Sequence, residues 1–289
     1  MPELPEVQTT VNGLQAKVLN RTFIDVWSDW EKLVRRPASF KQFKQKLRDK
    51  KILRVWRRAK NVIFELSDWY SLLIHMKMTG HLLVGSWKLG AGSWKPVAFG
   101  PLHDKINGFL HMVFTLDNGT MIALSDMRKF AKVELVSTEH VLQGLAALGP
   151  EPLDTRFTFE RFQQCFTKRR GKVKQVIMDQ TVIAGIGNIY ASEALWLAKI
   201  HPEKQVGKLS RRELRSLYRA IRKVLALGIK FGGDSFSDYR NVDGHMGTFE
   251  GKKNVYQREG NPCYRCKKAI KRVVVGARSS FFCPRCQKL

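Results

Sequence analysis

Four cysteines near the C-terminal end of the sequence carry its most specific chemistry. They form two Cys-x-x-Cys pairs, "CYRC" and "CPRC", separated by 16 residues: Cys263, Cys266, Cys283 and Cys286. Each pair can offer two thiolates to one side of a tetrahedral ion, and the segment between the pairs can fold back as a β-hairpin. Four thiolates leave no open coordination position, so we predict one structural Zn²⁺. The fifth cysteine, Cys165, stands alone and is interpreted as a packing residue.

The opening residues "MPELPEV" contain a second group that could react. Removal of Met1 would give Pro2 a free secondary amine. An α-amino group has a pKa of about 7.7 to 8.0, against about 10.4 for lysine, so far more of it is unprotonated and nucleophilic at neutral pH. Glu3 and Glu6 place two carboxylates beside it. The same residues also fit a plain helix start, because proline and acidic residues are common in a first turn. The residues alone leave both interpretations open.

The charge balance indicates the kind of partner. Lysine and arginine total 51 against 25 acidic residues, which gives a formal charge of +26 spread along the chain. A modest excess would suit a solvated surface, but an excess this large predicts a polyanionic partner, most simply nucleic acid. No apolar run reaches the roughly 18 residues of a membrane span, and the start lacks the apolar core of a signal peptide. We therefore expect an intracellular protein and no membrane partner.

The elements that must position these groups change in type along the chain. The first third shows short alternating stretches typical of half-buried strands, after one helix that starts near Pro5. The expected strands are "RTFIDVW", "KKILRVWRR", "NVIFEL", "SLLIHMKM", "HMVFTL", "TMIALSD" and "AKVELV". Asn118-Gly119 between two of them predicts a hairpin. Residues 84–103, which contain "GSWK" twice, are interpreted as a long loop.

Helical spacing begins after "LGPEPLD". The expected helices lie in "TFERFQQCFTK", "KQVIMDQ", "NIYASEALWLAKI" and "SRRELRSLYRAIRKVLALGI". Ser210 and Glu213 form a capping box at the start of the last one. A stretch rich in glycine, aspartate and serine follows and predicts a flexible loop before the cysteine module.

Several motifs occur in the order found in one enzyme family. They are "PELPEV", "RRAK", "HMKMTG", "DMRKF", "LGPEPL", "DQTVIAGIGNIYASEALW" and the terminal cysteine module. Over nearly its whole length the chain resembles the formamidopyrimidine-DNA glycosylases, bacterial enzymes that excise oxidised purines. Leu4 favours this branch over the sister group, endonuclease VIII, which typically begins Pro-Glu-Gly-Pro-Glu.

The resemblance implies an α+β multidomain fold. We expect an N-terminal antiparallel β-sandwich with a leading helix (1–135), a linker (136–150), a helix-two-turn-helix domain with a lesion-capping loop (151–255), and a zinc β-hairpin (256–289). Double-stranded DNA with a damaged base would bind in the cleft between the lobes, to a monomeric enzyme in the bacterial cytoplasm, at the nucleoid.

The resemblance also implies a bifunctional reaction. Pro2 would displace the damaged base through a Schiff-base intermediate and then cleave the strand by β,δ-elimination. Glu3 would protonate the sugar oxygen and shuttle protons, Glu6 would help to organise the site, and Lys60 would contact a phosphate. Arg278 of the zinc hairpin completes the expected catalytic set.

The remaining expected residues hold DNA. In the family, residues that match Met78, Arg128 and Phe130 fill the space left by the extruded nucleotide, and Arg128 would face the orphaned base. Residues that match Lys174 and Asn188 bind phosphate together with Arg278. His103 is included among the expected DNA contacts.

Departures from the family pattern affect specificity more than reaction type. Met127 stands where the family usually has proline, Met76 and Lys77 differ from the commoner residues, and the insert at about 85–100 is longer than usual. Two alternatives therefore stay open: the same chemistry on oxidised pyrimidines, or a protein that binds damaged DNA without catalysis.

Overall fold

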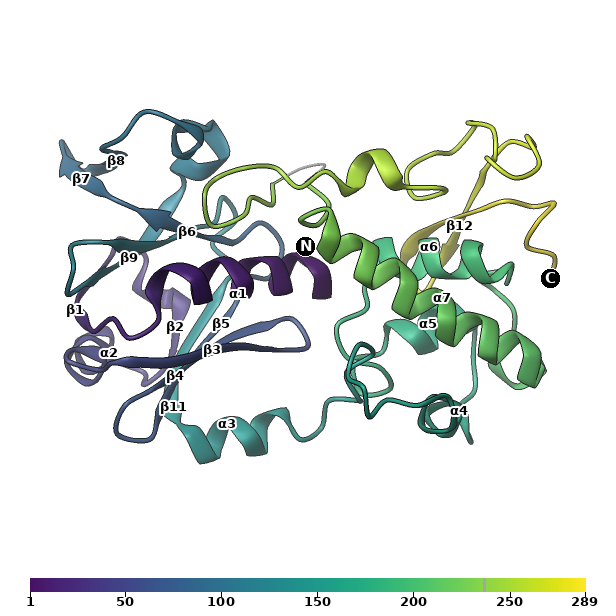
Figure 1. Cartoon of the computed structure of the whole chain (residues 1–289), viewed down its shortest axis with the longest axis horizontal. Coiled ribbons are helices and arrows are strands. Elements are labelled where there is room, and N and C mark those ends of the chain that lie inside the picture. The colour runs from purple at the N-terminus through teal and green to yellow at the C-terminus, as the bar shows by residue number, and fades with distance from the viewer. Residues whose placement is uncertain (236–237) are drawn as a thin grey trace. The chain divides into compact units, whose positions relative to one another are not determined.

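The computed structural model describes residues 1–235 and 238–289, and it divides into two compact units (Figure 1). The first unit contains residues 1–146 and 231–248, and the second contains residues 147–230 and 249–289. Residues 147–230 of the second unit therefore lie in sequence between the two parts of the first unit.

The first unit is mainly β-structure, and the second is mainly helical. The elements of the first unit are α1 (Leu4–Val18), β1 (Phe23–Ser28), β2 (Val34–Arg36), α2 (Phe40–Leu47), β3 (Ile52–Arg58), β4 (Asn61–Leu66), β5 (Tyr70–His75), β6 (His81–Gly85), β7 (Trp87–Gly90), β8 (Ser93–Pro96), β9 (Leu110–Leu116), β10 (Met121–Ser125), β11 (Lys132–Ser137) and α3 (Thr138–Leu145). Those of the second unit are α4 (Phe159–Phe166), α5 (Val173–Met178), α6 (Asn188–Ala198), α7 (Arg211–Lys230), β12 (Lys271–Val275) and β13 (Arg278–Phe282).

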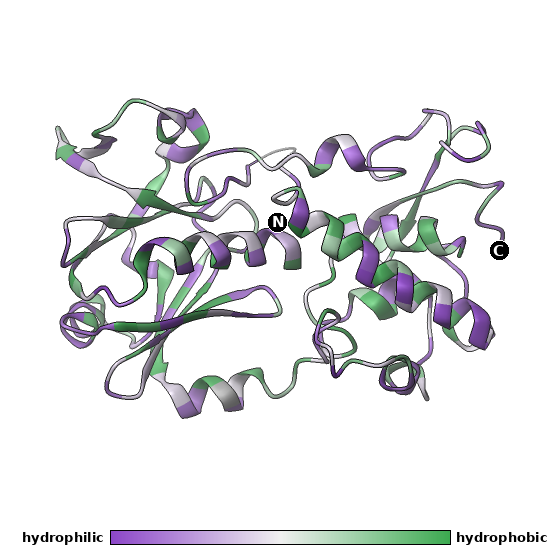
Figure 2. Ribbon diagram, viewed as in Figure 1, coloured by the Kyte–Doolittle hydropathy of each residue, from purple (hydrophilic) through white to green (hydrophobic). Residues whose placement is uncertain are grey.

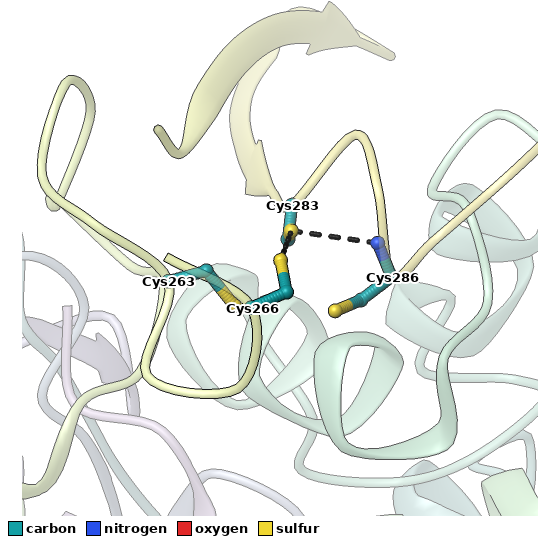
Figure 3. A group of neighbouring side chains, drawn as sticks. All are labelled: Cys263, Cys266, Cys283 and Cys286. Atoms are coloured by element: carbon teal, nitrogen blue, oxygen red, sulfur yellow. Dashed lines mark hydrogen bonds between the residues drawn. The ribbon is translucent and has the colours of Figure 1, made fainter. Parts of the chain in front are cut away.

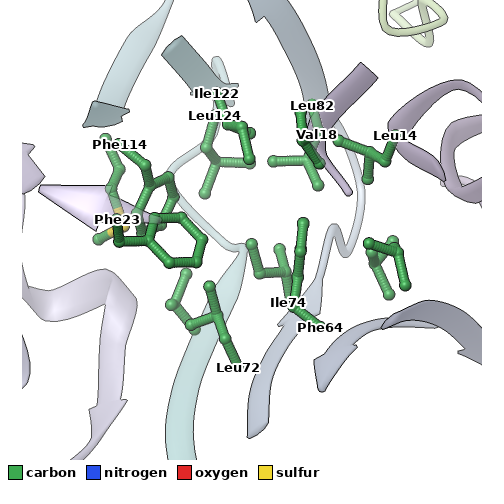
Figure 4. Close-up of a cluster of buried hydrophobic side chains, with 14 of the residues drawn as sticks. Leu14, Val18, Phe23, Phe64, Leu72, Ile74, Leu82, Phe114, Ile122 and Leu124 are labelled. Carbon is green, nitrogen blue, oxygen red and sulfur yellow. The ribbon is translucent and has the colours of Figure 1, made fainter. Parts of the chain in front are cut away.

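Two sheets and α1 enclose the core of the first unit. One sheet has the strand order β1-β9-β10-β6, and the other has the order β2-β11-β5-β4-β3, in which β2 pairs parallel with β11. Side chains from both sheets and from α1 meet in one buried cluster, with Phe23, Phe64 and Phe114 close to one another (Figure 4). Leu14 and Val18 bury the apolar face of α1 against this cluster. The core thus fixes the helix whose first turn carries Glu3 and Glu6.

The predicted fold class is confirmed, with corrections to single elements. Each predicted strand corresponds to an observed one, and the hairpin at Asn118-Gly119 joins β9 to β10 with Gly119 at φ +77°. The prediction of one helix in the first third was wrong, because α2 also forms there, and α3 lies in the predicted linker (136–150). The strand predicted over residues 71–78 ends at His75, so Met78 lies in a turn.

The long loop predicted over residues 84–103 is not a loop. Its first part completes β6, and β7 and β8 then pair as an antiparallel hairpin, from Trp87 opposite Pro96 to Gly90 opposite Ser93. Trp94 packs edge-on against Trp27 of β1, with 5.7 Å between ring centroids. Apolar packing between the two tryptophans therefore orders a segment whose glycine content suggested irregular structure.

The second unit has the four predicted helices. The capping box at the start of α7 is confirmed, because Ser210 Oγ accepts from Glu213 N (3.2 Å) and Ser210 N donates to Glu213 Oε2 (2.9 Å). Hydrophilic and hydrophobic bands alternate along α7, as the spacing of an amphipathic helix requires (Figure 2). No helix of the described residues is long and apolar enough to cross a membrane.

The segment Phe231–Thr248 differs from the predicted division. It follows α7 in sequence but groups with the first unit, whereas the prediction placed it in the helical domain. Residues 236 and 237, which belong to the predicted lesion-capping loop, lie outside the described residues. The finer division at residues 135, 150 and 255 remains a prediction.

Candidate functional site

The first turn of α1 is a reciprocal capping box built from two carboxylates. The Glu3 side chain accepts from the backbone N–H of Glu6, and Glu3 N donates to Glu6 Oε2 at 2.7 Å. Glu3 and Glu6 are 3% and 2% exposed, and Pro2 is buried in the chain that retains Met1. Sequence reasoning recognised the helix start and the acids as alternatives, whereas the structure shows that the two glutamates are both the cap and a buried acidic pair.

The segment after α7 completes the surroundings of Glu6. Glu6 Oε1 accepts from Asp234 N at 2.8 Å, and Tyr239 Oη donates to the Glu6 carbonyl oxygen at 2.9 Å. Burial and the Glu6 carboxylate raise the pKa of Tyr239 well above its usual value, so its hydroxyl stays protonated. Gly233 has φ +85°, and a Cβ there would lie 2.9 Å from Glu6 Oε1. Glu6 is therefore held from two segments that are more than 220 residues apart in sequence.

Lys60 lies in the turn between β3 and β4, as predicted, but it is buried rather than solvated (7% exposed). Ala59 before it adopts φ +53°. Arg57 supports the turn, because its Nη1 donates to the Ala59 carbonyl (2.9 Å) and its Nε donates to Gln8 Oε1 of α1 (3.0 Å). This contact joins the Lys60 turn to the helix that carries Glu3 and Glu6.

A histidine with no role in the sequence analysis lies near Lys60. His75 ends β5, opposite Asn61 of β4, and its Nδ1 accepts from Lys77 N at 3.0 Å. Burial and the positive charges of Lys77 and Lys60 lower the pKa of His75 to about 3, so the ring is neutral at physiological pH. The sequence shows His75 as the first residue of "HMKMTG". Its burial near Lys60 follows only from the pairing of β5 with β4.

Because these buried histidines are neutral in the folded protein, we expect its stability against unfolding to fall at acidic pH. His81, almost fully buried, has its pKa lowered to about 4 by burial and by Arg240, although Asn107, Thr79 and Asp126 oppose the shift. The unfolded chain therefore binds more protons below pH 6.5. Unfolding free energy should be highest above about pH 6.5 and should fall as the pH drops towards 4. Urea titrations between pH 7.5 and 5 check this, and a His81→Gln variant should show a flatter profile.

Three of the expected DNA contacts are exposed on neighbouring turns. Met78 is 38% exposed and Phe130 is 47% exposed, and the Arg128 guanidinium lies 4.5 Å from the Phe130 ring centroid. Large exposed apolar side chains next to an arginine suit insertion into a base stack. The structure thus brings together the three residues that the resemblance assigned to the vacated space.

Asp126 stabilises the turn that carries Arg128 by accepting hydrogen bonds from it. The carboxylate is fully buried, and it accepts from Ala131 N (2.7 Å), from Arg128 N (3.3 Å) and from the Thr79 hydroxyl. Thr79 follows Met78 directly, so one carboxylate links both turns. The sequence signal was an aspartate at the start of a turn, which commonly bonds backbone N–H groups ahead of it.

The resemblance assigns these two turns to filling the space of an extruded nucleotide, so we expect Asp126→Ala to weaken that step as well as stability. Loss of the carboxylate leaves buried donors unsatisfied, which costs about 1–3 kcal/mol for each group. The extruded-nucleotide complex should form less readily, so single-turnover excision should slow more than duplex binding weakens. Stopped-flow fluorescence of a base analogue beside the lesion measures this step. An Asp117→Ala variant at the exposed β9–β10 turn is the control and should match the wild type.

His103 is exposed in a short 3-10 helix (Pro101–His103) after the β7–β8 hairpin. Its ring lies 5.7 Å from that of Phe99, which is 98% exposed. No described contact places it with Glu3, Glu6 or Lys60, so its expected DNA contact stays a prediction.

The expected phosphate contacts of the second unit meet at an open, polar hollow of about 550 Å³. Asn188, the first residue of α6, lines it together with Arg272, Arg278 and Ser279. Gly187 is the N-cap of α6, so Asn188 is the first residue within the helix. Asn188 Oδ1 is buried and lacks a hydrogen-bond partner among the described residues. A helix N-terminus beside two arginines suits a phosphate group.

Lys174 is fully buried rather than open to the hollow. Its Nζ donates to Ser192 Oγ of α6 (3.0 Å), and to Ser279 O (3.1 Å) and Ser280 Oγ (2.7 Å) of β13. These bonds hold the strand that begins with Arg278 against the helix that begins with Asn188. The geometry supports a positioning role for Lys174, and its direct phosphate contact remains a prediction.

The four predicted metal ligands meet at one point. Their ligand atoms all lie within 4.8 Å of one another, and both pairs turn their sulfurs inward (Figure 3). Burial alone would raise the pKa of the Cys263 thiol, but hydrogen bonds from the Trp196 indole and from the N–H groups of Cys266 and Arg265 lower it to about 6. A donor set of four sulfurs at this separation fits tetrahedral Zn²⁺ with bonds of about 2.3 Å.

Groups outside the ligand set fix this module to α6. The Trp196 indole lies 3.5 Å from Cys263 Sγ, and Gln287 bridges Cys283 N (2.8 Å) to the Ile200 carbonyl (2.8 Å). Arg265 stacks on Trp196 at 3.8 Å. None of these contacts could be inferred from the cysteine spacing.

Family models match three stretches of the chain. Residues 1–133 match the "Formamidopyrimidine-DNA glycosylase N-terminal domain", residues 148–240 match the "Formamidopyrimidine-DNA glycosylase H2TH domain", and residues 260–289 match the "Zinc finger found in FPG and IleRS".

Whole-length relatives and solved structures agree with these matches. The formamidopyrimidine-DNA glycosylase of Pelotomaculum thermopropionicum is 40% identical, and the alignment covers 100% of both chains. The Lactococcus lactis Fpg in complex with abasic-site DNA is 32% identical, with a TM-score of 0.86 over 99% of this chain and 100% of that one. MutM in complex with DNA containing carbocyclic 8-oxo-G is also 32% identical to this chain in sequence, with a TM-score of 0.86. The alignment covers 100% of both chains.

Proposed function

Because the chain belongs to the formamidopyrimidine-DNA glycosylase family, it is a DNA glycosylase and AP lyase of base excision repair, and we propose that it excises oxidised purines through Pro2. Four cysteines hold its one structural zinc ion. The observation that carries the proposal is the buried pair Glu3 and Glu6, bonded to each other directly after the proline.

The reaction begins once Met1 has been removed. The Pro2 nitrogen attacks C1′ of the damaged nucleotide, and a bond from nitrogen to C1′ replaces the bond from C1′ to the base. The base leaves with the electron pair of that bond and takes up the proton that the amine loses. Glu3 donates a proton to the sugar ring oxygen, so the ring opens and an iminium ion remains on Pro2. The iminium acidifies the neighbouring C2′ proton, and β- and δ-elimination then break the strand on both sides of the sugar.

Glu6 and Lys60 support these steps from fixed positions. Glu6 is bonded to Glu3 N and Asp234 N, which makes it an organiser of the turn that holds Pro2 and Glu3. Lys60, in the turn joined to α1 through Arg57, supplies a positive charge for a phosphate of the lesion strand. The predicted lesion-capping loop, residues 232–251, is proposed to close over the extruded base.

DNA is held by residues of both units. Extrusion of a nucleotide costs a few kcal/mol of unstacking, and Met78, Arg128 and Phe130 offset it by filling the space. Asn188 and Arg278 bind a phosphate, and zinc fixes the hairpin that carries Arg278. We infer a monomer acting on double-stranded DNA.

A panel of lesion duplexes tests the substrate class. The duplexes carry 8-oxoguanine, a formamidopyrimidine, a thymine glycol or no lesion, with each base opposite in turn. Excision of the first two with little of the third supports the proposal. Faster excision of thymine glycol would overturn it in favour of oxidised pyrimidines.

Glu3→Gln should separate the two activities. The amide keeps the shape of the cap but donates no proton to the sugar, so excision of 8-oxoguanine should fall by about 10²- to 10⁴-fold. Cleavage of a preformed abasic site needs no base departure and should fall less. Single-turnover rates on both substrates measure the difference, and a Glu139→Gln variant at an exposed position of α3 serves as the control. Equal losses on both substrates would contradict the assigned role.

A further inference from the structure

Asn107 is a buried side chain that the proposed reaction does not use. It is 1% exposed, and its Nδ2 donates to the carbonyl oxygens of Pro101 (2.8 Å) and Gly244 (3.2 Å). Its Oδ1 faces His81 Nε2 at 2.9 Å. Two carbonyl acceptors on one side fix the orientation of the amide. Asn107 thus joins the short 3-10 helix Lys105–Gly108 to the segment 231–248 and to β6.

Asp104 makes a second contact to the same segment. Its Oδ2 accepts from both Nε and Nη2 of Arg240 at 2.9 Å, and the Arg240 side chain is only 7% exposed. Burial opposes ionisation of Asp104, but hydrogen bonds from Ile106 N and Arg240 lower its pKa, so the carboxylate is charged at neutral pH. A largely buried guanidinium depends on this partner.

The backbone around Gly244 packs too closely against its neighbours to admit a side chain. Gly244 has φ +84°, and a Cβ there would lie 2.7 Å from Asn107 Nδ2. Two residues earlier, the Val242 carbonyl accepts from Val84 N at 2.7 Å. Tyr239 to Gly244 are therefore fixed along one side of the first unit, and Tyr239 reaches Glu6.

The other end of this network reaches the void-filling turns. His81 is neutral, because burial and the facing Arg240 outweigh Asp126, and its single N–H, on Nε2, goes to Asn107 Oδ1. Its Nδ1 lies 3.4 Å from the carbonyl oxygen of Thr79, whose hydroxyl donates to Asp126. Hydrogen bonds thus run from Gly244 through Asn107 to the buried His81, and His81 lies two residues after Thr79, whose hydroxyl is bonded to Asp126 in the turn that presents Arg128.

We propose that Asp104 and Asn107 are positioning residues for base excision, which hold the segment 239–244 beside Glu6 in register with the turns of Met78 and Arg128. This inference rests on the proposed function. The segment acts on the extruded base, and an abasic substrate has no base. Loss of either residue therefore impairs removal of the base and spares cleavage of a preformed abasic site.

The experiment compares single-turnover rates on an 8-oxoguanine duplex and an abasic-site duplex. Asp104→Asn and Asn107→Ala should each slow excision by about tenfold or more, the effect of losing about 1.4 kcal/mol, and should leave abasic-site cleavage within about twofold. The exchange Asp104→Arg with Arg240→Asp restores the ion pair and should recover part of the excision rate. Lys17→Gln is the control, because its ion pair with Asp243 of the same segment is half-exposed.

Two results would overturn the inference. Equal slowing of both reactions in the single variants would mean that the residues act on the fold as a whole. Unchanged excision would mean that the segment needs no such support. A wild-type enzyme that cleaves abasic sites but excises neither purine lesion would instead contradict the proposed substrate, and one that cuts neither substrate would contradict the function itself.

Discussion

A chain that retains Met1 is expected to bind lesion DNA normally and to be nearly inactive. In that chain the Pro2 nitrogen is an amide, whose lone pair is delocalised and cannot attack C1′. The rate of 8-oxoguanine excision should fall by roughly three orders of magnitude or more, as is typical when a nucleophile is lost. Insertion of one bulky residue between Met1 and Pro2 prevents removal of Met1 and provides the variant.

The measurement pairs single-turnover kinetics with fluorescence anisotropy on the same duplex. Mass spectrometry of the intact protein establishes which N-terminus is present. Pro2→Ala is the matched control, because the small residue permits removal of Met1 and leaves a primary amine at the same place. It should retain more activity than the insertion. Full activity in the insertion variant would contradict the role of Pro2.

Removal of zinc is expected to have the second largest effect. Structural zinc contributes roughly 10–16 kcal/mol to the folding of small zinc modules at neutral pH. Without it the β12–β13 hairpin loses its support, so Arg272 and Arg278 no longer face Asn188 across the hollow. We expect DNA affinity to fall by about 10²-fold or more, since charge-assisted phosphate contacts of about 1.5–3 kcal/mol each are lost. Cys283→Ser, with zinc content measured, tests this expectation by anisotropy.

The zinc variant has an internal control in the first unit. The buried cluster around Phe23 and Phe114 shares no residue with the module, so its unfolding transition should be retained. Cys165→Ser, at a half-buried cysteine outside the cluster, should bind both zinc and DNA normally. Normal DNA affinity in Cys283→Ser would show that the hairpin does not depend on zinc.

Local patterns carried most of the fold prediction. Period-two alternation located the strands that pair around Phe64, and helical spacing located α4 to α7, because both reflect which face each element buries. The β7–β8 hairpin was missed because its stability comes from packing between Trp27 and Trp94, which are far apart in sequence. The secondary-structure propensities of single residues contain no information on a contact between residues so far apart in sequence.

The site was predictable where one short motif supplies the chemistry. The Cys-x-x-Cys pairs gave the metal ligands, and "PELPE" placed Glu3 and Glu6 at the start of a helix, where their catalytic roles remain a prediction. The contacts between Glu6 and Asp234, or between Asp104 and Arg240, span more than a hundred residues, so only the folded chain reveals them. For Lys174 the motif identified the residue, but only the structure shows that its side chain is buried against β13.

The most direct test of the central claim is borohydride trapping on an 8-oxoguanine duplex. Reduction of the iminium links enzyme and DNA covalently, and peptide mapping then identifies the residue. We predict one adduct, on the nitrogen of Pro2, that is absent from the chain that retains Met1. An adduct on a lysine such as Lys60, or no adduct during active excision, would contradict the account.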